Sequence, residues 1–199
     1  MKKYELTSET KIVFGHILYR IKALSSFGCV SAGDLGGFLE SEKNLSQNGN
    51  AWVSGNAEVY GNAEVYGNAE VYGNAEVYGN AEVSGNARVS GNAEVSGNAR
   101  VSGNAWVSGD AWVSGNAEVS EIGAIFWIGA IGSRNDTATF FRCRDGSIKV
   151  VCGCFFGNLD EFAKKVRKTH GDNDHAKVYM LAIEMAKIRI GDKKEKTEE

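Results

Sequence analysis

Twelve consecutive six-residue units fill the middle of the chain, from Gly49 to Ser120, without an insertion. Each unit reads Gly-Asn-Ala-x-Val followed by Ser or Tyr, and the only change at the Asn position is Asp110. Glycine and asparagine tolerate left-handed backbone conformations, so each pair predicts a tight corner. Valine is stiff at χ1 and suits a strand. Each unit therefore predicts one short strand and one corner of a solenoid.

Three units make a triangular coil of 18 residues, so the twelve units predict four coils stacked about 4.8 Å apart. The valines, beginning with Val53 and Val59, are expected to point inward with the alanines and to form ladders. A buried valine contributes roughly 1.5–3 kcal/mol, so these ladders can support a narrow core. No single unit buries its own apolar face, and stability must therefore be cooperative between neighbouring units.

The register Val-Ser-Gly-Asn-Ala-Glu resembles the hexapeptide repeat of the left-handed β-helix superfamily, which is best known from acyltransferases. That pattern has an aliphatic residue first and a small residue at the fifth place, here valine and alanine. The resemblance implies a mainly β protein built on a left-handed parallel β-helix of about four 18-residue coils. It also implies a homo-oligomer, with a trimer favoured, because such helices commonly associate through their flat faces. The fold alone does not determine function.

The 18-residue period predicts which outward side chains lie above one another on the three faces. The first face carries Trp52, Glu70, Arg88 and Trp106, the second Glu58, Glu76, Glu94 and Trp112, and the third Glu64, Glu82, Arg100 and Glu118. The second face stacks three glutamates without a basic residue, which destabilises a ladder. It is either a site for a cation or a basic partner, or a solvated acidic face whose side chains splay apart.

Aromatic residues are unevenly placed on this outer surface. Tyr60 and Tyr78 are expected to stack on one face, and Trp106 and Trp112 to sit on adjoining faces of the last coil. Outward tryptophan is costly unless something covers it, so these residues are candidates for an interface. The alternative is that they are strand formers that stabilise an outer ladder. A ligand is expected at the C-terminal module or near Trp106, Trp112 and Trp127.

The two ends are expected to cap the solenoid, because an open end exposes a sheet edge and apolar core. Residues 1–48 are interpreted as an N-terminal cap with a strand over 17–23 and an irregular first coil. Residues 49–132 form the β-helix and its closing segment. Residues 133–191 predict a small α+β module of two strands and two helices, with Asn158 capping the first helix and Gly171 ending it. Residues 192–199 predict a disordered charged tail.

The termini also resemble uncharacterised hexapeptide-repeat proteins of bacteriophages and prophages. The similar segments are 3–7, 18–21, 32–38, 153–155, 159–162 and 169–172. This resemblance implies a phage or prophage setting and brings no catalytic residues with it. The net charge of −3, with mixed signs, argues against nucleic-acid binding. Without a signal peptide or an apolar span, and with four cysteines interpreted as reduced thiols, we expect a cytoplasmic protein of the bacterial host cell and no membrane partner.

Hexapeptide-repeat acyltransferases use a histidine base, but the repeats contain no histidine. His16 precedes them and His170 and His175 follow. The two late histidines, with Asp172, could bind a metal or could form an interhelical turn, which we favour. No metal or cofactor is assigned. We expect a non-catalytic binding and assembly protein that interferes with host defence by binding a host protein or sequestering a small signalling molecule. The alternatives are a divergent acyl- or nucleotidyl-transferase and a passive virion component.

Overall fold

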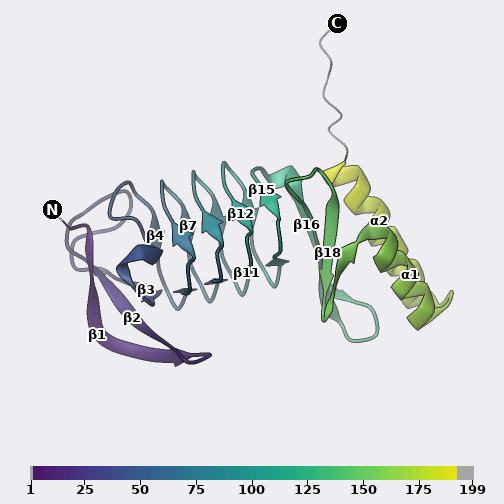
Figure 1. Cartoon of the computed structure of the whole chain (residues 1–199), viewed down its shortest axis with the longest axis horizontal. Coiled ribbons are helices and arrows are strands. Elements are labelled where there is room, and N and C mark those ends of the chain that lie inside the picture. The colour runs from purple at the N-terminus through teal and green to yellow at the C-terminus, as the bar shows by residue number, and fades with distance from the viewer. Residues whose placement is uncertain (1, 192–199) are drawn as a thin grey trace, which may run out of the picture. The chain divides into compact units, whose positions relative to one another are not determined.

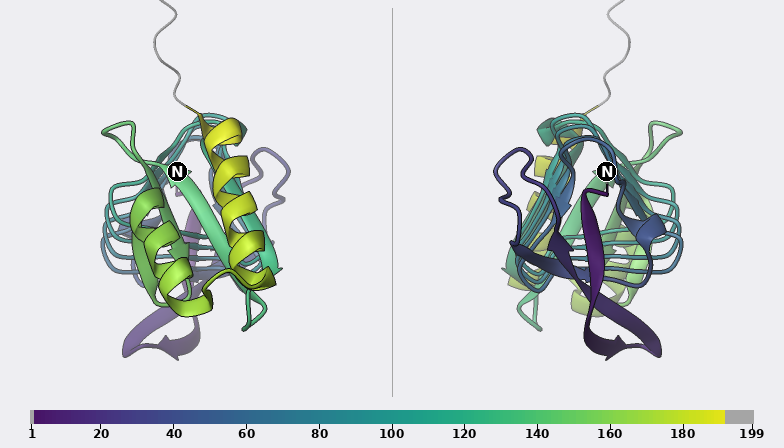
Figure 2. Two further views of the ribbon diagram at one scale, coloured as in Figure 1. Left: turned by 90° about the vertical axis from the view of Figure 1, so that its right-hand side faces the viewer. Right: turned by 90° about the vertical axis from the view of Figure 1, so that its left-hand side faces the viewer.

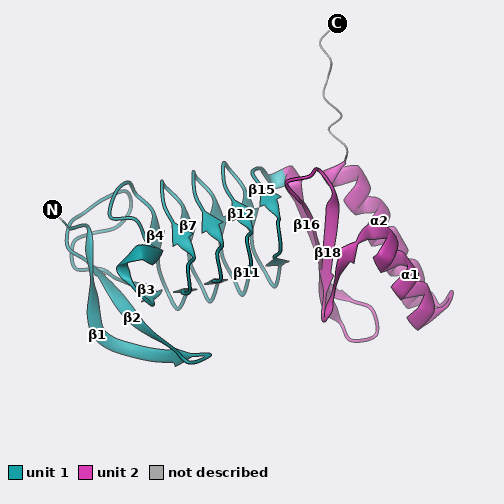
Figure 3. Cartoon of the chain, in the orientation of Figure 1, with its two compact units in different colours: residues 1–122 teal, residues 123–199 magenta. Residues whose placement is uncertain are grey.

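The computed structural model describes residues 2–191 of the chain. It divides into two compact units, residues 1–122 and residues 123–199 (Figure 3). Each unit has its own β-sheet structure, and each is described separately below. Among the described residues, no helix is long and apolar enough to cross a membrane.

The twelve repeats form twelve two-residue strands on three parallel sheets, as predicted (Figure 1). The strands are β4 (Trp52–Val53), β5 (Glu58–Val59), β6 (Glu64–Val65), β7 (Glu70–Val71), β8 (Glu76–Val77), β9 (Glu82–Val83), β10 (Arg88–Val89), β11 (Glu94–Val95), β12 (Arg100–Val101), β13 (Trp106–Val107), β14 (Trp112–Val113) and β15 (Glu118–Val119). Strands pair with a period of 18 residues, for example Glu94 opposite Trp112. The parallel β-helix of four regular coils is therefore confirmed.

Valine and alanine fill the inside of the solenoid, and every repeat valine and alanine is 0–1% exposed. The corners are held by glycines with positive φ, such as Gly85 at +66°. A Cβ on Gly85 would lie 2.8 Å from the amide nitrogen of Gly103 in the next coil. Any side chain here would therefore meet the backbone above it as well as strained dihedrals. This is why glycine occupies the corner in every unit.

The corner asparagines form ladders along the outside of the coils. In one ladder, the side-chain amide of Asn56 donates to Asn74 Oδ1, Asn74 donates to Asn92 Oδ1, and Asn92 donates to Asp110 Oδ1, at distances of 3.3, 3.1 and 2.9 Å. In the ladder that contains Asn86, the bond to Asn104 Oδ1 is the last. Each amide thus donates toward the following coil, and the final member of a ladder needs only an acceptor.

The N-terminal residues add an irregular first coil and an antiparallel hairpin to one of the three sheets. Strands β1 (Tyr4–Val13) and β2 (His16–Ala23) pair with each other, and β2 pairs with β3 (Leu35–Leu39). Strand β3 runs parallel to β5 and is followed by the 3₁₀ helix η1 (Glu42–Asn44). Figure 2 shows the hairpin extending from the edge of the solenoid. The predicted strand over 17–23 and the irregular coil are both present.

Two side chains close the N-terminal end of the core. The buried Tyr4 hydroxyl donates to Leu45 O at 2.6 Å, and burial raises the pKa of this phenol. The Lys3 ammonium donates to Ala51 O at 2.9 Å, and burial lowers its pKa to about 8. Both groups satisfy carbonyls that have no preceding coil to bond with, as a cap requires.

The second unit is a four-stranded antiparallel sheet with two helices. Its elements are β16 (Ile125–Ile131), β17 (Asp136–Arg142), β18 (Ile148–Cys152), β19 (Phe155–Asn158), α1 (Leu159–His170) and α2 (Asp174–Ile190). The strands follow one another in the sheet, and Figure 2 shows the helices side by side across it. The β17–β18 hairpin and the Asn158 cap are confirmed, the latter by a bond of 2.9 Å from Glu161 N to Asn158 Oδ1. Gly171 ends α1, also as predicted.

Two details of the C-terminal prediction differ from the structure. Residues 121–132 were expected to close the solenoid, but Ile125–Ile131 pair with β17 and begin the second sheet. The 3₁₀ helix η2 (Ile122–Ala124) lies where the units divide. The second helix exists, but its predicted apolar face is wrong in part, because only Ala182 of that face is buried. The predicted tail, 192–199, lies outside the described residues.

Candidate binding surfaces

The second outward ladder carries a stripe of acidic and aromatic side chains, which we call the acidic–aromatic stripe: Glu76, Tyr78, Glu94 and Trp112. The backbone register places Glu76, Glu94 and Trp112 on successive strands of one sheet. The Tyr78 hydroxyl donates to Glu94 Oε2 at 3.1 Å, and the Trp112 indole donates to Ser96 Oγ at 3.2 Å. The predicted stacking of the ladder is therefore present, and its side chains are tied to one another.

The N-terminal hairpin covers the beginning of this ladder. Lys11 forms an ion pair with Glu58, and its ammonium lies 4.0 Å from the centre of the Phe38 ring. Tyr60, which is 5% exposed, packs beneath the hairpin and stacks on Tyr78 with ring centroids 5.2 Å apart. Tyr60 is thus part of the packing between hairpin and solenoid, and Tyr78 is the tyrosine of this pair that remains partly open.

Sequence reasoning missed Lys11 and Phe38 as members of this face. Phe38 lies opposite Glu58 in the sheet, although the two are 20 residues apart and not 18. The irregular first coil therefore falls outside the period that was used to align the ladders. The alternating pattern of residues 4–13 could have indicated a strand, but not the face on which it lies.

His16 also comes close to the first coil through the hairpin. Its Nδ1 lies 2.9 Å from Glu40 Oε1, and its ring centroid lies 5.2 Å from that of Tyr60. The bond from His16 lowers the pKa of Glu40, and the amide of Gly61, which donates to Glu40 Oε2, contributes to the same shift. The contact joins the hairpin to the solenoid, which the sequence position of His16 did not predict.

Glutamates of the acidic–aromatic stripe differ electrostatically from those of the other two faces. Glu70 is 3.3 Å from Arg88, and Glu82 is 3.0 Å from Arg100, so those ladders are neutralised. Within residues 2–191, neither Glu76 nor Glu94 forms an ion pair. Burial raises the pKa of Glu76, and the neighbouring charges of Glu58 and Glu94 raise it further. The stripe is therefore a place where negative charge accumulates at a cost to the fold.

The three tryptophans that were predicted as binding residues lie in different surroundings. Trp106 is 47% exposed and its indole donates to Ser90 Oγ at 3.3 Å. Trp112 is 37% exposed and ends the acidic–aromatic stripe. Trp127 is half-buried in β16 opposite Thr139 and belongs to the second unit. The first two remain open on adjoining faces of the solenoid, as predicted.

The segment from His170 to His175 forms the turn between α1 and α2. The Asn173 side chain caps α2 by accepting from Ala176 N at 3.1 Å. The two imidazole centroids are 5.7 Å apart, and His170 stacks on Tyr179, while Asp172 and His175 are exposed. Among residues 2–191, no group of three or more His, Cys, Asp or Glu side chains is placed to hold a metal ion. The interhelical turn that the sequence favoured is thus observed.

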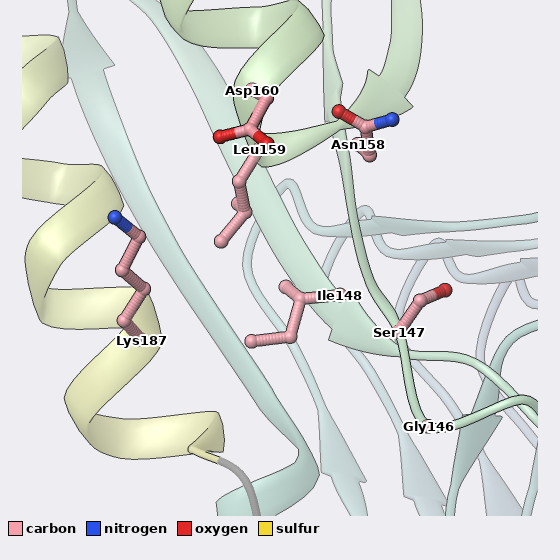
Figure 4. A pocket seen from close by; sticks show the side chains of 7 residues that line it. All are labelled: Gly146, Ser147, Ile148, Asn158, Leu159, Asp160 and Lys187. Atoms are coloured by element: carbon pink, nitrogen blue, oxygen red, sulfur yellow. The ribbon is translucent and has the colours of Figure 1, made fainter.

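The second unit contains two small surface pockets. One, of about 320 Å³, is lined by residues that include Cys152, Phe162, His170 and Tyr179. Burial raises the pKa of the Cys152 thiol, which lies 3.7 Å from the Tyr179 hydroxyl oxygen. A thiol held protonated in this way is a poor nucleophile. The other pocket is a hollow of about 440 Å³, in which Ile148, Leu159 and Lys187 face the same space (Figure 4).

A larger hollow of about 690 Å³ lies in the first unit beside the irregular first coil. Its lining combines Leu35 and Tyr72 with the polar residues Asn68 and Glu70. Trp52, on its edge, is 8% exposed and packs edge-on against Tyr4 and Phe27. Trp52 therefore supports the cap, although it belongs to the same ladder as the exposed Trp106.

Comparison with known proteins agrees with the repeat architecture. The family described as YdcK Beta solenoid repeat matches residues 81–97 and 93–109, which lie within the regular coils. A search of curated proteins gave no match. The matched residues make up less than half of the chain, so they show what its coils are similar to. Together with the three parallel sheets, they show that the chain is a β-helix repeat protein.

Proposed function

We propose that this protein is a non-catalytic binding and assembly protein, and that its solenoid presents the acidic–aromatic stripe to a basic segment of a partner protein. The observation that carries this proposal is the contrast between the faces. Two ladders place arginine beside glutamate, whereas the stripe places Glu76 and Glu94 one coil apart without an ion pair among the described residues. Such local departures from the most stable arrangement are expected at functional sites.

The aromatic members of the stripe support a cationic partner in particular. Tyr78 and Trp112 lie on the same face as the carboxylates, and both keep part of their rings exposed. A lysine or arginine that enters such a surface gains a charge-assisted bond to carboxylate and a cation–π contact of about 0.5–2 kcal/mol. Because the rings are already fixed by bonds to Glu94 and Ser96, little side-chain entropy is lost on binding.

A labelled oligoarginine peptide tests this proposal, with a neutral oligoglutamine peptide as a reference. Anisotropy titration should show the E76Q/E94Q variant binding oligoarginine about tenfold more weakly than the unaltered protein. The matched control is E64Q/E82Q, which changes net charge equally on another face and should keep most of the affinity. Equal losses in the two variants would mean that only net charge matters, and would overturn the proposal.

The finer parts of the sequence-based hypothesis stay predictions. These are membership of the hexapeptide-repeat superfamily, the phage setting, interference with host defence, a trimer and a cytoplasmic location. Sequestration of a small molecule would use a pocket, and the pocket of about 690 Å³ beside Trp52 is the roomiest one described above. A transferase would require a histidine base, and the His16–Glu40 pair is engaged in attaching the hairpin. We therefore favour binding over catalysis.

A further inference from the structure

Helix α2 has two apolar faces on opposite sides. One face packs into the core of its unit through residues that include Ala176, Tyr179, Ile183 and Ile190. The other face is exposed and consists of four residues, which we call the outer seam: Val178 at 43%, Leu181 at 65%, Met185 at 50% and Ile188 at 84%. A helix that is apolar on both sides normally lies between two packed layers. Here the second layer must come from outside the described unit.

The spacing of the outer seam indicates what that layer is. Its residues follow one another at intervals of three, four and three, which are the a and d positions of a heptad repeat. A strict a/d stripe is the narrow seam of a helix pair and is narrower than the face that packs on a sheet. The first heptad has Val178 at a and Leu181 at d, a combination that favours two-stranded pairing in parallel dimers.

The charges beside the seam favour a parallel arrangement of two copies. Glu184 occupies a g position, and Arg189 occupies the e position five residues later. In a parallel pair, each Glu184 faces Arg189 of the other copy, which gives two ion pairs. An antiparallel pair that matches Leu181 with Met185 would bring the two Glu184 side chains together. Flanking charges of this kind set the orientation of paired helices.

We infer that a second copy of this chain docks on the outer seam, so that the two α2 helices pair in parallel about a two-fold axis. The seam is only about three turns long, and an isolated peptide of this length would not pair stably. In this unit α2 is already held as a helix by its inner face, so association does not need to order the backbone. The inference rests on α2 alone and is independent of the proposed acidic–aromatic stripe.

Sedimentation equilibrium of the full chain, combined with native mass spectrometry, tests the pairing. The unaltered protein should be a dimer, and L181E/I188E should raise the dimer dissociation constant about tenfold or more. The control L35E places the same charge on a leucine that is 54% exposed in the first unit, and it should leave association unchanged. A monomer at roughly 100 µM would overturn the inference, as would an oligomer that is insensitive to L181E/I188E.

A charge exchange tests the orientation and does not depend on the folding of the apolar variants. Both Glu184 and Arg189 are exposed, so E184R and R189E should keep the fold, which circular dichroism can verify. Each single variant should weaken association, because it places like charges across the interface. The double variant E184R/R189E should regain most of the lost affinity. Failure of the double variant to recover would overturn the parallel pairing, whereas neither result bears on oligoarginine binding.

Discussion

At the scale of single residues, the asparagine ladders explain why the repeat tolerates one exception. Every ladder amide donates to the coil that follows it, so an interior position needs both a donor and an acceptor. Asp110 accepts from Asn92 and stands at the end of its ladder, where no further amide is needed. A carboxylate is therefore compatible with this position, and its place in the sequence reflects its place in the ladder.

This reasoning predicts opposite tolerance at two equivalent asparagines. Asn92→Asp removes a donor and places a carboxylate against Asp110, which should destabilise the solenoid by about 1 kcal/mol at pH 7. Asn104→Asp, at the end of its own ladder, should change the urea midpoint much less, because Asn86 can still donate to it. Urea unfolding of both variants checks this, and equal midpoints would show that the ladder bonds contribute nothing.

At the scale of elements, the sequence predicted what depends on local pattern. The strands and corners, the β17–β18 hairpin and the caps of α1 all follow from short motifs, and they are present. The pairing of β16 with β17 depends on tertiary contacts, so its residues were placed in the wrong unit. In α2 both faces show helical apolar spacing, and the pattern alone could not choose which one the sheet covers.

The candidate site was predictable to the same degree. The 18-residue period placed Glu76, Glu94 and Trp112 in one ladder correctly. It could not reveal that a distant hairpin covers Tyr60 and neutralises Glu58, because nothing in the spacing of residues 4–23 refers to that face. The remaining open part of the ladder was visible only once the hairpin was in place.

The glutamate ladder itself predicts an unusual pH dependence. Because the pKa of Glu76 is raised in the folded state, the folded protein holds this proton more tightly than the unfolded chain. Its contribution to stability is therefore present at low pH and is lost as the pH rises through the raised pKa. Glu76→Gln should stabilise the protein by about 0.5 kcal/mol at pH 7, and the gain should vanish well below pH 4.5.

Thermal unfolding across pH 3–8 measures this effect, with Glu64→Gln on another face as the matched control. Glu64 is exposed, and the exchange removes the same charge. A gain at pH 7 that is the same for both variants would contradict the assignment to the acidic–aromatic stripe, since it would reflect net charge only.

At the scale of the whole molecule, the two units have separate cores. Valine and alanine ladders stabilise the first, and a cluster that includes Phe140, Phe162 and Tyr179 stabilises the second. We therefore expect two unfolding transitions. Val89→Ala should lower only the transition of the solenoid, and Phe162→Ala should lower only that of the second unit, each by about 1–4 kcal/mol. Urea unfolding followed by hydrogen exchange checks this, and one transition that moves with both variants would contradict it.

The corner glycines and the 18-residue register have a consequence for how such a chain can change its length. Loss or gain of three units would shorten or lengthen the solenoid by one coil, about 4.8 Å, while every later side chain keeps its face. Loss of a single unit would instead turn everything downstream by one face and separate Glu94 and Trp112 from Glu76. The coding sequence of this solenoid is thus read in steps of three repeats, and its length can drift in evolution while the order of its faces cannot.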